Sequence, residues 1–290
     1  MQNIFTRKAP VANCKDVFAI CDLPGFAALA ESVPDDNGAR HCCRAGRKWS
    51  GNKEYNTSLA QVRAGDLSGV AASDALLDKI EAESFLSPVW RTRLDVVGGV
   101  PNVPAYIAGQ PLNMRRRERV LSEQGPLQVF ASMELSADIE VDTMRKRGAA
   151  VLALVRLLSN ARPVELWTCC SGGAQGYASH VLVRLDTAPL DLARVAHVLT
   201  CPSVTRGLGY AVLSHTAKLQ LDKTWNGHWG YDDHVAYRRT ARENFATAVS
   251  PATESVLIPA AHVNDPCVAN HVAWLKDMLA TYGGAMTEAA

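Results

Sequence analysis

The stretch Arg147-Gly-Ala-Ala-Val-Leu-Ala-Leu-Val-Arg-Leu-Leu158 decides the fold class, together with Arg162-Pro-Val-Glu-Leu-Trp167, which follows three residues later. In the first part, apolar residues recur at intervals of three and four, which predicts a helix with one face against a core. Asn160-Ala-Arg-Pro163 ends this helix, and the apolar run from Val164 to Cys170 predicts a buried strand. The two segments together predict a crossover unit of a parallel sheet.

The C-terminal half of the chain continues as alternating strands and helices. A strand is predicted at Leu127–Ser132, ahead of the helix, and another at Ser179–Leu185. No crossover helix fits between the strands at 164–170 and 179–185, so Ser171-Gly-Gly-Ala-Gln-Gly176 is predicted to be a hairpin-like turn between antiparallel strands. Further elements are predicted at 191–199 (helix), 255–259 (strand) and 266–282 (helix). The predicted fold class is α/β, with a mainly parallel sheet flanked by helices.

The pattern predicts three regions along the chain. Residues 1–97 are expected to form an elaborated, mixed helical N-terminal region, with short helices at Ser58–Ala64 and Ser73–Glu83. Residues 98–126 are expected to form a proline-rich connector and a basic segment, because each proline restricts the preceding residue to extended geometry. Residues 127–290 are expected to form the α/β domain.

Composition and charge limit the classes of function. With 290 residues and 48% hydrophobic composition, the chain can bury a sizeable core. Its 30 Lys and Arg against 29 Asp and Glu give a net charge of +1, so contact with nucleic acid or an anionic membrane would need a local patch. The run from Ala149 to Val155 is far shorter than the roughly 20 residues of a membrane span, and the N-terminus lacks the apolar segment of a secretion signal. We expect a soluble protein of the cytoplasm that makes no membrane contact.

The eight cysteines are interpreted as small buried hydrophobes. Disulfides are disfavoured because adjacent cysteines cannot easily pair with each other and the cytosol is reducing. The alternative is a zinc site, although the spacing lacks two short chelating pairs. Its possible ligands would be Cys14, Cys21, His41, Cys42 and Cys43.

Ligands bind beyond the carboxyl ends of strands in doubly wound sheets, which directs attention to residues 132–138, 169–173 and 259–265. The first of these reads Ser132-Met-Glu-Leu-Ser-Ala-Asp138 and precedes a helix with small residues. The layout resembles the start of a von Willebrand factor A-like domain, in which an Asp-x-Ser-x-Ser loop holds a divalent metal. The resemblance covers roughly Leu127 to Tyr282, and a Rossmann-like sheet is the alternative. Met133 or Glu134 stands where that family has its Asp and only Ser136 matches, so the resemblance implies a degenerate metal loop. No cofactor is predicted, and a divalent metal is possible.

Two further features of this rim have competing interpretations. The segment 171–176 could cradle a phosphate, but it lacks a Gly-x-x-x-x-Gly-Lys pattern, which favours a flexible turn. Cys169 or Cys170 could supply a nucleophile, but a buried thiol at a strand end has no reason to ionise, which favours an inert role.

The segment Trp225-Asn-Gly-His-Trp-Gly-Tyr-Asp-Asp-His234 is the richest cluster of chemically capable side chains. One hypothesis is a metal site or an oriented histidine base in a hydrolase or nuclease, using His228, Asp232 and His234. The other is a loop that binds a partner protein, because Trp and Tyr are favoured at interfaces. The contact residues would then be Trp225, Trp229 and Tyr231.

The run Arg115-Arg-Arg-Glu-Arg119 is the only dense basic segment. Its arginines could bind nucleic-acid phosphates, and such binding would weaken with salt. The alternative is the solvated start of a helix, paired with Glu118 and Glu123. On the first hypothesis the nucleic-acid contacts would be Arg115, Arg116, Arg117 and Arg119.

Several segments together resemble uncharacterised proteins encoded by tailed bacteriophages. They are Trp49-Ser-Gly51, Val100 to Pro111, Asn113-Met-Arg-Arg116 and the Gly148 helix with Val164-Glu-Leu-Trp167. The resemblance implies a phage origin, with the host cytoplasm or the virion as location, and no catalytic residues. The leading hypothesis is therefore a non-catalytic interaction or virion-associated protein that binds a phage or host protein. The alternatives are the metal-dependent hydrolase or nuclease and the nucleic-acid-binding factor.

Overall fold

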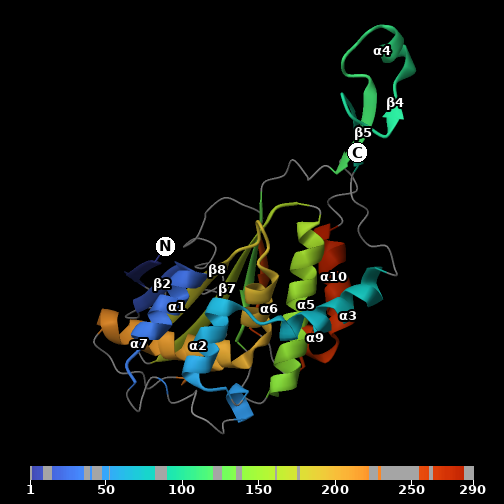
Figure 1. Ribbon diagram of the computed structural model, residues 1–290. Coiled ribbons are helices and arrows are strands. Elements are labelled where there is room, and N and C mark those ends of the chain that lie inside the picture. The colour runs from blue at the N-terminus through green and yellow to red at the C-terminus, as the bar shows by residue number, and fades with distance from the viewer. Residues whose placement is uncertain are drawn as a thin grey trace.

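The chain forms an α/β body and a smaller β lobe (Figure 1). The lobe comprises residues 90–119, and the body comprises the other residues described. The computed structural model describes residues 2–8, 15–35, 40, 48–51, 53–81, 90–119, 126–134, 139–160, 162–174, 177–221, 228–229, 255–260 and 264–283.

A seven-stranded sheet runs through the body. Three of the five neighbouring pairs along its main path are parallel, namely β2–β8, β6–β7 and β6–β10. The β7–β8 pair is antiparallel, which confirms the predicted hairpin within a mainly parallel sheet. In spatial order the main path is β1 (Gln2–Lys8), β2 (Lys15–Asp22), β8 (Tyr177–Leu185), β7 (Val164–Ala174), β6 (Leu127–Ser132) and β10 (Ser255–Ile258), and β9 (His228–Trp229) pairs with β7.

Helices cover one face of this sheet, because their apolar sides and alternate residues of the strands share one large core. Leu127, Val129 and Ala131 point into this core from β6. The helices that contribute buried side chains to it are α1 (Leu23–Ser32), α2 (Tyr55–Ala64), α3 (Val70–Glu81), α5 (Val141–Ser159), α6 (Leu192–Thr200), α7 (Tyr210–Leu221) and α10 (His271–Gly283). Shorter helical segments are η2 (Lys48–Ser50), η3 (Leu67–Gly69), η4 (Val204–Gly209) and α9 (Pro266–Ala269). No described helix has the length and apolarity needed to cross a bilayer.

The helix α5 lies where the sequence predicts it, and it ends at Asn160 as expected. It begins at Val141, after Glu140, which has the extended conformation of an N-cap. Asp142 lies inside the first turn and forms an ion pair with Lys146. Ser73, where the sequence predicts a helix to begin, lies inside α3, because η3 leads directly into α3 at Val70.

The opposite face of the sheet carries a second apolar cluster, and each of its described members belongs to a strand. Successive strand residues point to opposite faces, so these side chains alternate with those of the large core. The rings of Phe5 and Phe18 stack with centroids 5.4 Å apart, and those of Phe130 and Trp167 with centroids 6.4 Å apart. The other members are Cys169, Leu182, Ile20 and Leu257.

The lobe is a three-stranded antiparallel sheet of order β3-β5-β4 with one short helix. No described residue of the lobe belongs to any apolar core cluster of the body. Figure 1 shows it standing away from the body on its own. Its elements are β3 (Trp90–Asp95), β4 (Val100–Pro101), α4 (Val103–Ile107) and β5 (Met114–Arg119).

These elements correct the predicted division of the chain at two places. Residues 1–97 do not form a helical region apart from the sheet, because β1 and β2 pair with each other and β2 pairs with β8. Residues 98–126 are not a simple connector, because residues 98–119 form the lobe together with β3. In the first place the pairing partner β8 lies far away in the sequence, and in the second the prolines of 98–126 hide the strands of the lobe.

Candidate functional site

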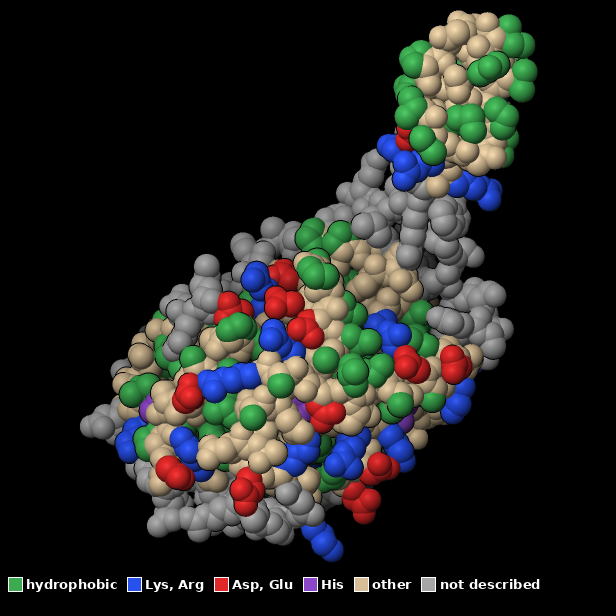
Figure 2. Space-filling view, in the orientation of Figure 1, with side chains coloured by type: hydrophobic (Ala, Val, Ile, Leu, Met, Phe, Trp, Pro, Cys, Tyr) green, Lys and Arg blue, Asp and Glu red, His purple; other side chains and the backbone are tan. Residues whose placement is uncertain are grey.

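The outer part of the lobe, residues 96–113, is here called the tip. It contains no Asp, Glu, Lys, Arg or His. Ile107 is 78% exposed and Tyr106 is 70% exposed. Figure 2 shows hydrophobic side chains gathered over this part of the lobe. Among the described residues, seven of the ten exposed large hydrophobic side chains belong to the tip: Val96, Val97, Val100, Val103, Tyr106, Ile107 and Leu112.

Such a concentration is informative, because single exposed apolar residues are normal whereas contiguous apolar patches mark interaction sites. The body supplies only two other members of the described set, Leu67 and Leu219, which lie on different segments. The tip is therefore the part of the described surface that is best suited to bury apolar area against another molecule.

Several backbone groups of the tip are hydrogen-bonded within the lobe. Three of its residues are prolines and have no N–H group to satisfy. Burial of an unpaired backbone group is costly, so internal pairing lowers the cost of covering the tip. The pairs, donor first, are Gly99 N to Arg115 O, Asn102 N to Asn113 O, Tyr106 N to Asn102 O, Ala108 N to Pro104 O and Gln110 N to Ala105 O.

The strands β3 and β5 form the base of the lobe, here called the stem. On one face of the stem, Asp95 accepts a charged hydrogen bond of 3.0 Å from Arg93 and lies 3.6 Å from Arg116. The pKa of Asp95 is lowered, first by the hydrogen bond from the N–H of Val96 and then by the two guanidinium groups. This face therefore carries its own counter-charge.

On the other face of the stem, no described carboxylate pairs with the arginines. The ladder pairs Leu94 with Arg115 and Thr92 with Arg117, so the alternation of strand residues places these four on the same face. Arg115 and Arg117 are exposed, and neither forms an ion pair with a described residue. The predicted helix start at 115–119 is thus wrong, because the arginines form a strand paired with β3.

The predicted rim of the body is assembled as expected. Ser132 at the end of β6 pairs with Cys169 of β7, and Arg147 of α5 donates a 2.8 Å hydrogen bond to the carbonyl of Pro259, which follows β10. The three rim segments therefore converge. Residues 169–173, however, continue the strand β7 and do not form a loop.

The cysteines of this rim are buried. Burial raises the pKa of both Cys169 and Cys170, and the nearby Glu134 raises it further. Cys21, the one member of the suggested zinc set among the described residues, is also buried, and its pKa is raised to about 12. A thiol in this state is not a ready nucleophile, which supports the inert interpretation.

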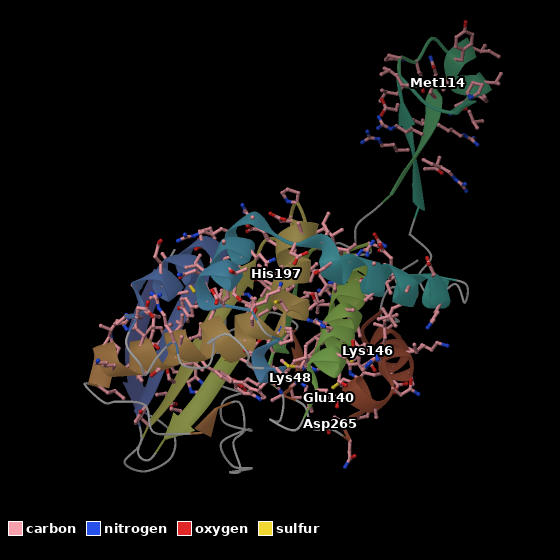
Figure 3. The ribbon with its side chains drawn as sticks, turned by 60° about the horizontal axis from the view of Figure 1, so that its bottom comes forward. Lys48, Met114, Glu140, Lys146, His197 and Asp265 are labelled. Carbon is pink, nitrogen blue, oxygen red and sulfur yellow. The ribbon has the colours of Figure 1, made fainter. Side chains whose placement is uncertain are left out.

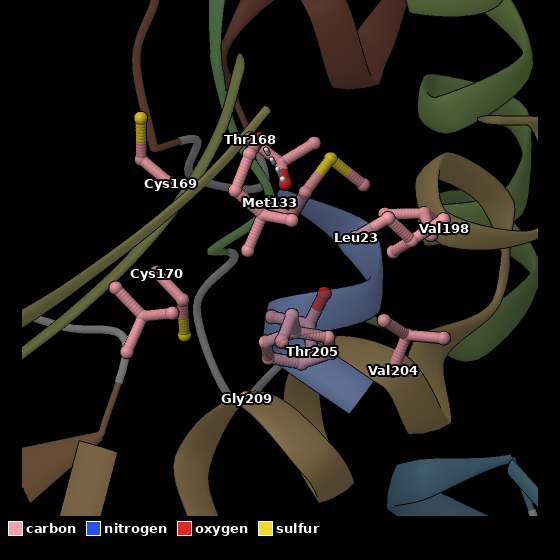
Figure 4. A pocket seen from close by; sticks show the side chains of 12 residues that line it. Leu23, Met133, Thr168, Cys169, Cys170, Val198, Val204, Thr205 and Gly209 are labelled. Atoms are coloured by element: carbon pink, nitrogen blue, oxygen red, sulfur yellow. Dashed lines mark hydrogen bonds between the residues drawn. The ribbon is translucent and has the colours of Figure 1, made fainter. Parts of the chain in front are cut away.

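A small apolar cavity lies beside these thiols (Figure 4). Its walls include Cys170, Met133, Thr205, Gly209 and Leu23. The cavity measures about 30 Å³, and a single water already needs about 10 to 15 Å³. The cavity is too small to hold a substrate molecule, so we interpret it as a packing void.

The degenerate metal loop is described in part. Ser132 accepts a hydrogen bond from the N–H of Glu134, and both side chains are buried. Ser136 lies outside the described residues. Among the residues that the structure does describe, no three His, Cys, Asp or Glu side chains are placed to hold a metal ion.

The aromatic and histidine-rich segment at 225–234 is described only at β9. The backbone of His228 pairs with that of Gly173, and Trp229 pairs with Gly172, so this segment joins the sheet beside β7. The other residues of both hypotheses lie outside the described part of the chain: Asp232, His234, Trp225 and Tyr231.

The sequence did not reveal a group of three polar side chains on the sheet face that carries the second apolar cluster: Asp16, Ser171 and His180. His180 Nδ1 lies 3.0 Å from the hydroxyl of Ser171, and His180 Nε2 lies 3.9 Å from a carboxylate oxygen of Asp16. The ring of His180 stacks on Phe18 with centroids 4.9 Å apart. Asp16, Ser171 and His180 come from three strands, and only the register of β2, β8 and β7 shows that they meet.

Two other buried polar groups were also missed. Arg206 lies in the π-helix η4, donates hydrogen bonds of 2.9 Å to the carbonyls of Trp49 and Ile139, and stacks over the Trp49 ring. His197 of α6 lies inside the layer of helices (Figure 3), 3.7 Å from Asp66. Burial lowers its pKa to about 4, with a further contribution from Lys53. Both groups lie where helical segments pack together.

Comparison with known proteins identifies the family of the chain but no activity. No curated protein and no solved structure matches the chain. The model of a family described as a domain of unknown function (DUF7192) matches residues 16–283, from β2 through the lobe to α10. The chain therefore belongs to the DUF7192 family of domains of unknown function.

Proposed function

We propose that this protein is a non-catalytic interaction protein of a bacteriophage, which binds another phage or host protein through the tip of its lobe. It acts either in the virion or in the cytoplasm of the infected host. The observation that carries the proposal is the uncharged tip, with its seven exposed hydrophobic side chains and its internally paired backbone.

The energetics of burial support a protein partner. Covering one exposed Val, Ile or Leu side chain stabilises a complex by about 1.5 to 3 kcal/mol. Several such side chains can offset the entropy lost on association, while the paired backbone keeps the cost of desolvation low. The tip has the character of the centre of a protein interface, which is apolar and depleted of charge.

The body fits the same proposal as a scaffold. We interpret the order β6, polar loop, α5, β7 and β8 as a von Willebrand A-like arrangement with a degenerate metal loop. The antiparallel β7–β8 pair inside the sheet favours this arrangement over a Rossmann-like sheet of parallel strands. The buried thiols of the rim support a non-catalytic role for that edge.

A photo-crosslinking experiment tests the proposal. A photoreactive phenylalanine analogue replaces Ile107 at the tip or, as a control, Leu219, an apolar residue of α7 that is 59% exposed. The full-length protein is irradiated in infected cells, and adducts are identified by mass spectrometry. We expect one discrete adduct from position 107 that is absent from position 219. Absence of an adduct at position 107, or the same adducts from both positions, would overturn the proposal.

A further inference from the structure

We propose that the stem of the lobe is a nucleic-acid-binding ribbon, in which Arg115 and Arg117 bind phosphates of a duplex. This goes beyond the proposed function, because it concerns the stem and not the tip. The basic run Arg115–Arg119 would then act as part of the strand β5, in the surface that β3 and β5 form together.

The charge distribution of the stem is the first argument. Its described side chains include four arginines, Arg93, Arg115, Arg116 and Arg117, against one carboxylate, Asp95. Asp95 interacts with Arg93 and Arg116 on one face, which leaves Arg115 and Arg117 on the other face without an ion pair to a described residue. A cationic surface concentrated on one face of a nearly neutral protein is the electrostatic footprint of a phosphate-binding site.

The spacing of the two arginines is the second argument. They are two residues apart on the same strand, so they point to the same side about 6.8 Å apart. Successive phosphates of one DNA strand rise only about 3.4 Å along the helix axis but also turn about it, so neighbouring phosphates are about 7 Å apart through space, which matches the spacing of the two arginines. Guanidinium groups also bind phosphate oxygens in bidentate geometry, which a lysine cannot do.

The shape of the stem is the third argument. Within the described residues, β3 and β5 pair from Trp90–Arg119 to Asp95–Met114. β4 adds a third strand only beside Met114 and Arg115, so the rest of the stem is a two-stranded ladder, and it stands clear of the body (Figure 1). The major groove of B-DNA, about 12 Å wide, admits a two-stranded ribbon. Sheet ribbons are an established way for proteins to enter a groove.

The test measures the binding of the full-length protein to short fluorescent DNA and RNA duplexes by anisotropy over a series of salt concentrations. We expect binding at low salt that weakens as salt rises. In the double variant Arg115→Ala/Arg117→Ala, we expect weaker binding and a salt slope smaller by about 2, one unit for each phosphate that the variant no longer binds. Arg115→Lys/Arg117→Lys should recover most of the slope, because the charge is kept.

A control variant distinguishes binding at the stem from binding through positive charge elsewhere on the protein. Arg145→Ala removes an exposed arginine from α5 of the body and should leave the affinity and the slope unchanged. Ile107→Ser at the tip should also leave duplex binding unchanged, so failure of this inference and failure of the proposed function are distinguishable.

Three outcomes would overturn the inference. The first is no binding to either duplex at low salt. The second is equal loss of binding in Arg145→Ala and in the stem variant. The third is binding of the stem to vesicles of anionic phosphatidylglycerol without binding to a duplex, which would point to a lipid surface. Circular dichroism melting of each variant shows that the fold is intact, as expected for substitutions of exposed residues.

Discussion

Gly148 of α5 lies against the carbonyl oxygen of Leu199 in α6, so closely that a Cβ atom at position 148 would overlap that oxygen. The same Cβ would also approach the Cα of Thr200 to 2.9 Å. Two helices can cross this tightly only where one of them has no side chain. The Gly148 helix, which decides the fold class in the sequence, thus also fixes how the helical layer packs.

The first prediction concerns this crossing. Alanine normally stabilises a helix by about 1 kcal/mol relative to glycine. At position 148 the overlap is with backbone atoms, so we expect Gly148→Ala to lower the free energy of unfolding by about 2 kcal/mol or more. Urea denaturation measures the change. Gly99→Ala, where a Cβ would meet no atom within 4 Å, serves as control and should shift stability by less than about 0.5 kcal/mol. Equal effects of the two variants would contradict the close crossing.

The second prediction concerns pH. The pKa of His197 falls from 6.5 to about 4 in the folded protein, because burial disfavours its charged form and Lys53 repels it, against a smaller opposing effect of Asp66. The unfolded chain therefore binds the proton more tightly, and stability is lost as the pH falls from about 6.5 towards 4. Below about 4 this histidine contributes no further loss.

Urea denaturation at pH 7 and at pH 5 measures this loss of stability. We expect His197→Gln to flatten the dependence over this interval. His215→Gln, a change at a less buried histidine of α7, should leave it as steep as in the wild type. A wild-type slope that survives in His197→Gln would assign the effect to other groups.

The third prediction concerns the thiols. Cys21, Cys169 and Cys170 are buried with raised pKa values, so a maleimide at neutral pH should leave them unlabelled in the folded protein. Cys201 is less buried and should react faster. Mass spectrometry of labelled peptides gives the order of reactivity, and labelling after unfolding shows that every thiol is competent. Rapid labelling of Cys169 or Cys170 would reopen the nucleophile hypothesis.

The fourth prediction concerns the independence of the lobe. No described residue of 90–119 belongs to a core cluster of the body. Replacing residues 90–119 by a short Gly-Ser linker should therefore change the free energy of unfolding of the body by about 1 kcal/mol or less, since loop-closure entropy varies only slowly with length. A loss of several kcal/mol would mean that the lobe packs on the body.

Much of the fold can be predicted from local sequence patterns. The strand Leu127–Ser132, the end of α5 at Asn160 and the start of α6 beside Asp191 all lie at their predicted positions. Each is set by neighbours in the sequence: an apolar run, a proline shortly after the helix, and a side chain that accepts a hydrogen bond from the N–H of Arg194. The β7–β8 hairpin follows from the lack of room for a crossover helix.

The parts that could not be predicted depend on partners far away in the sequence. Nothing near Val17 or Phe18 shows that β2 pairs with β8, which comes much later in the chain. The lobe is not evident from the sequence, because its three prolines indicate an extended connector. Its run of arginines also lacks the alternation of apolar and polar residues that is typical of a strand. Its signal is present in another form: an uncharged run from 96 to 113, rich in Val, and bordered by arginines on both sides.

Recovery of the partner protein by variants of the tip shows directly whether the tip binds it. The partner identified by crosslinking is recovered with the wild type, with Val97→Ser/Ile107→Ser at the tip, and with Leu219→Ser on α7 as matched control. We expect recovery to fall at least about tenfold with the tip variant, which corresponds to about 1.4 kcal/mol of binding free energy, and to be unchanged with Leu219→Ser. Equal recovery with all three proteins would contradict the account.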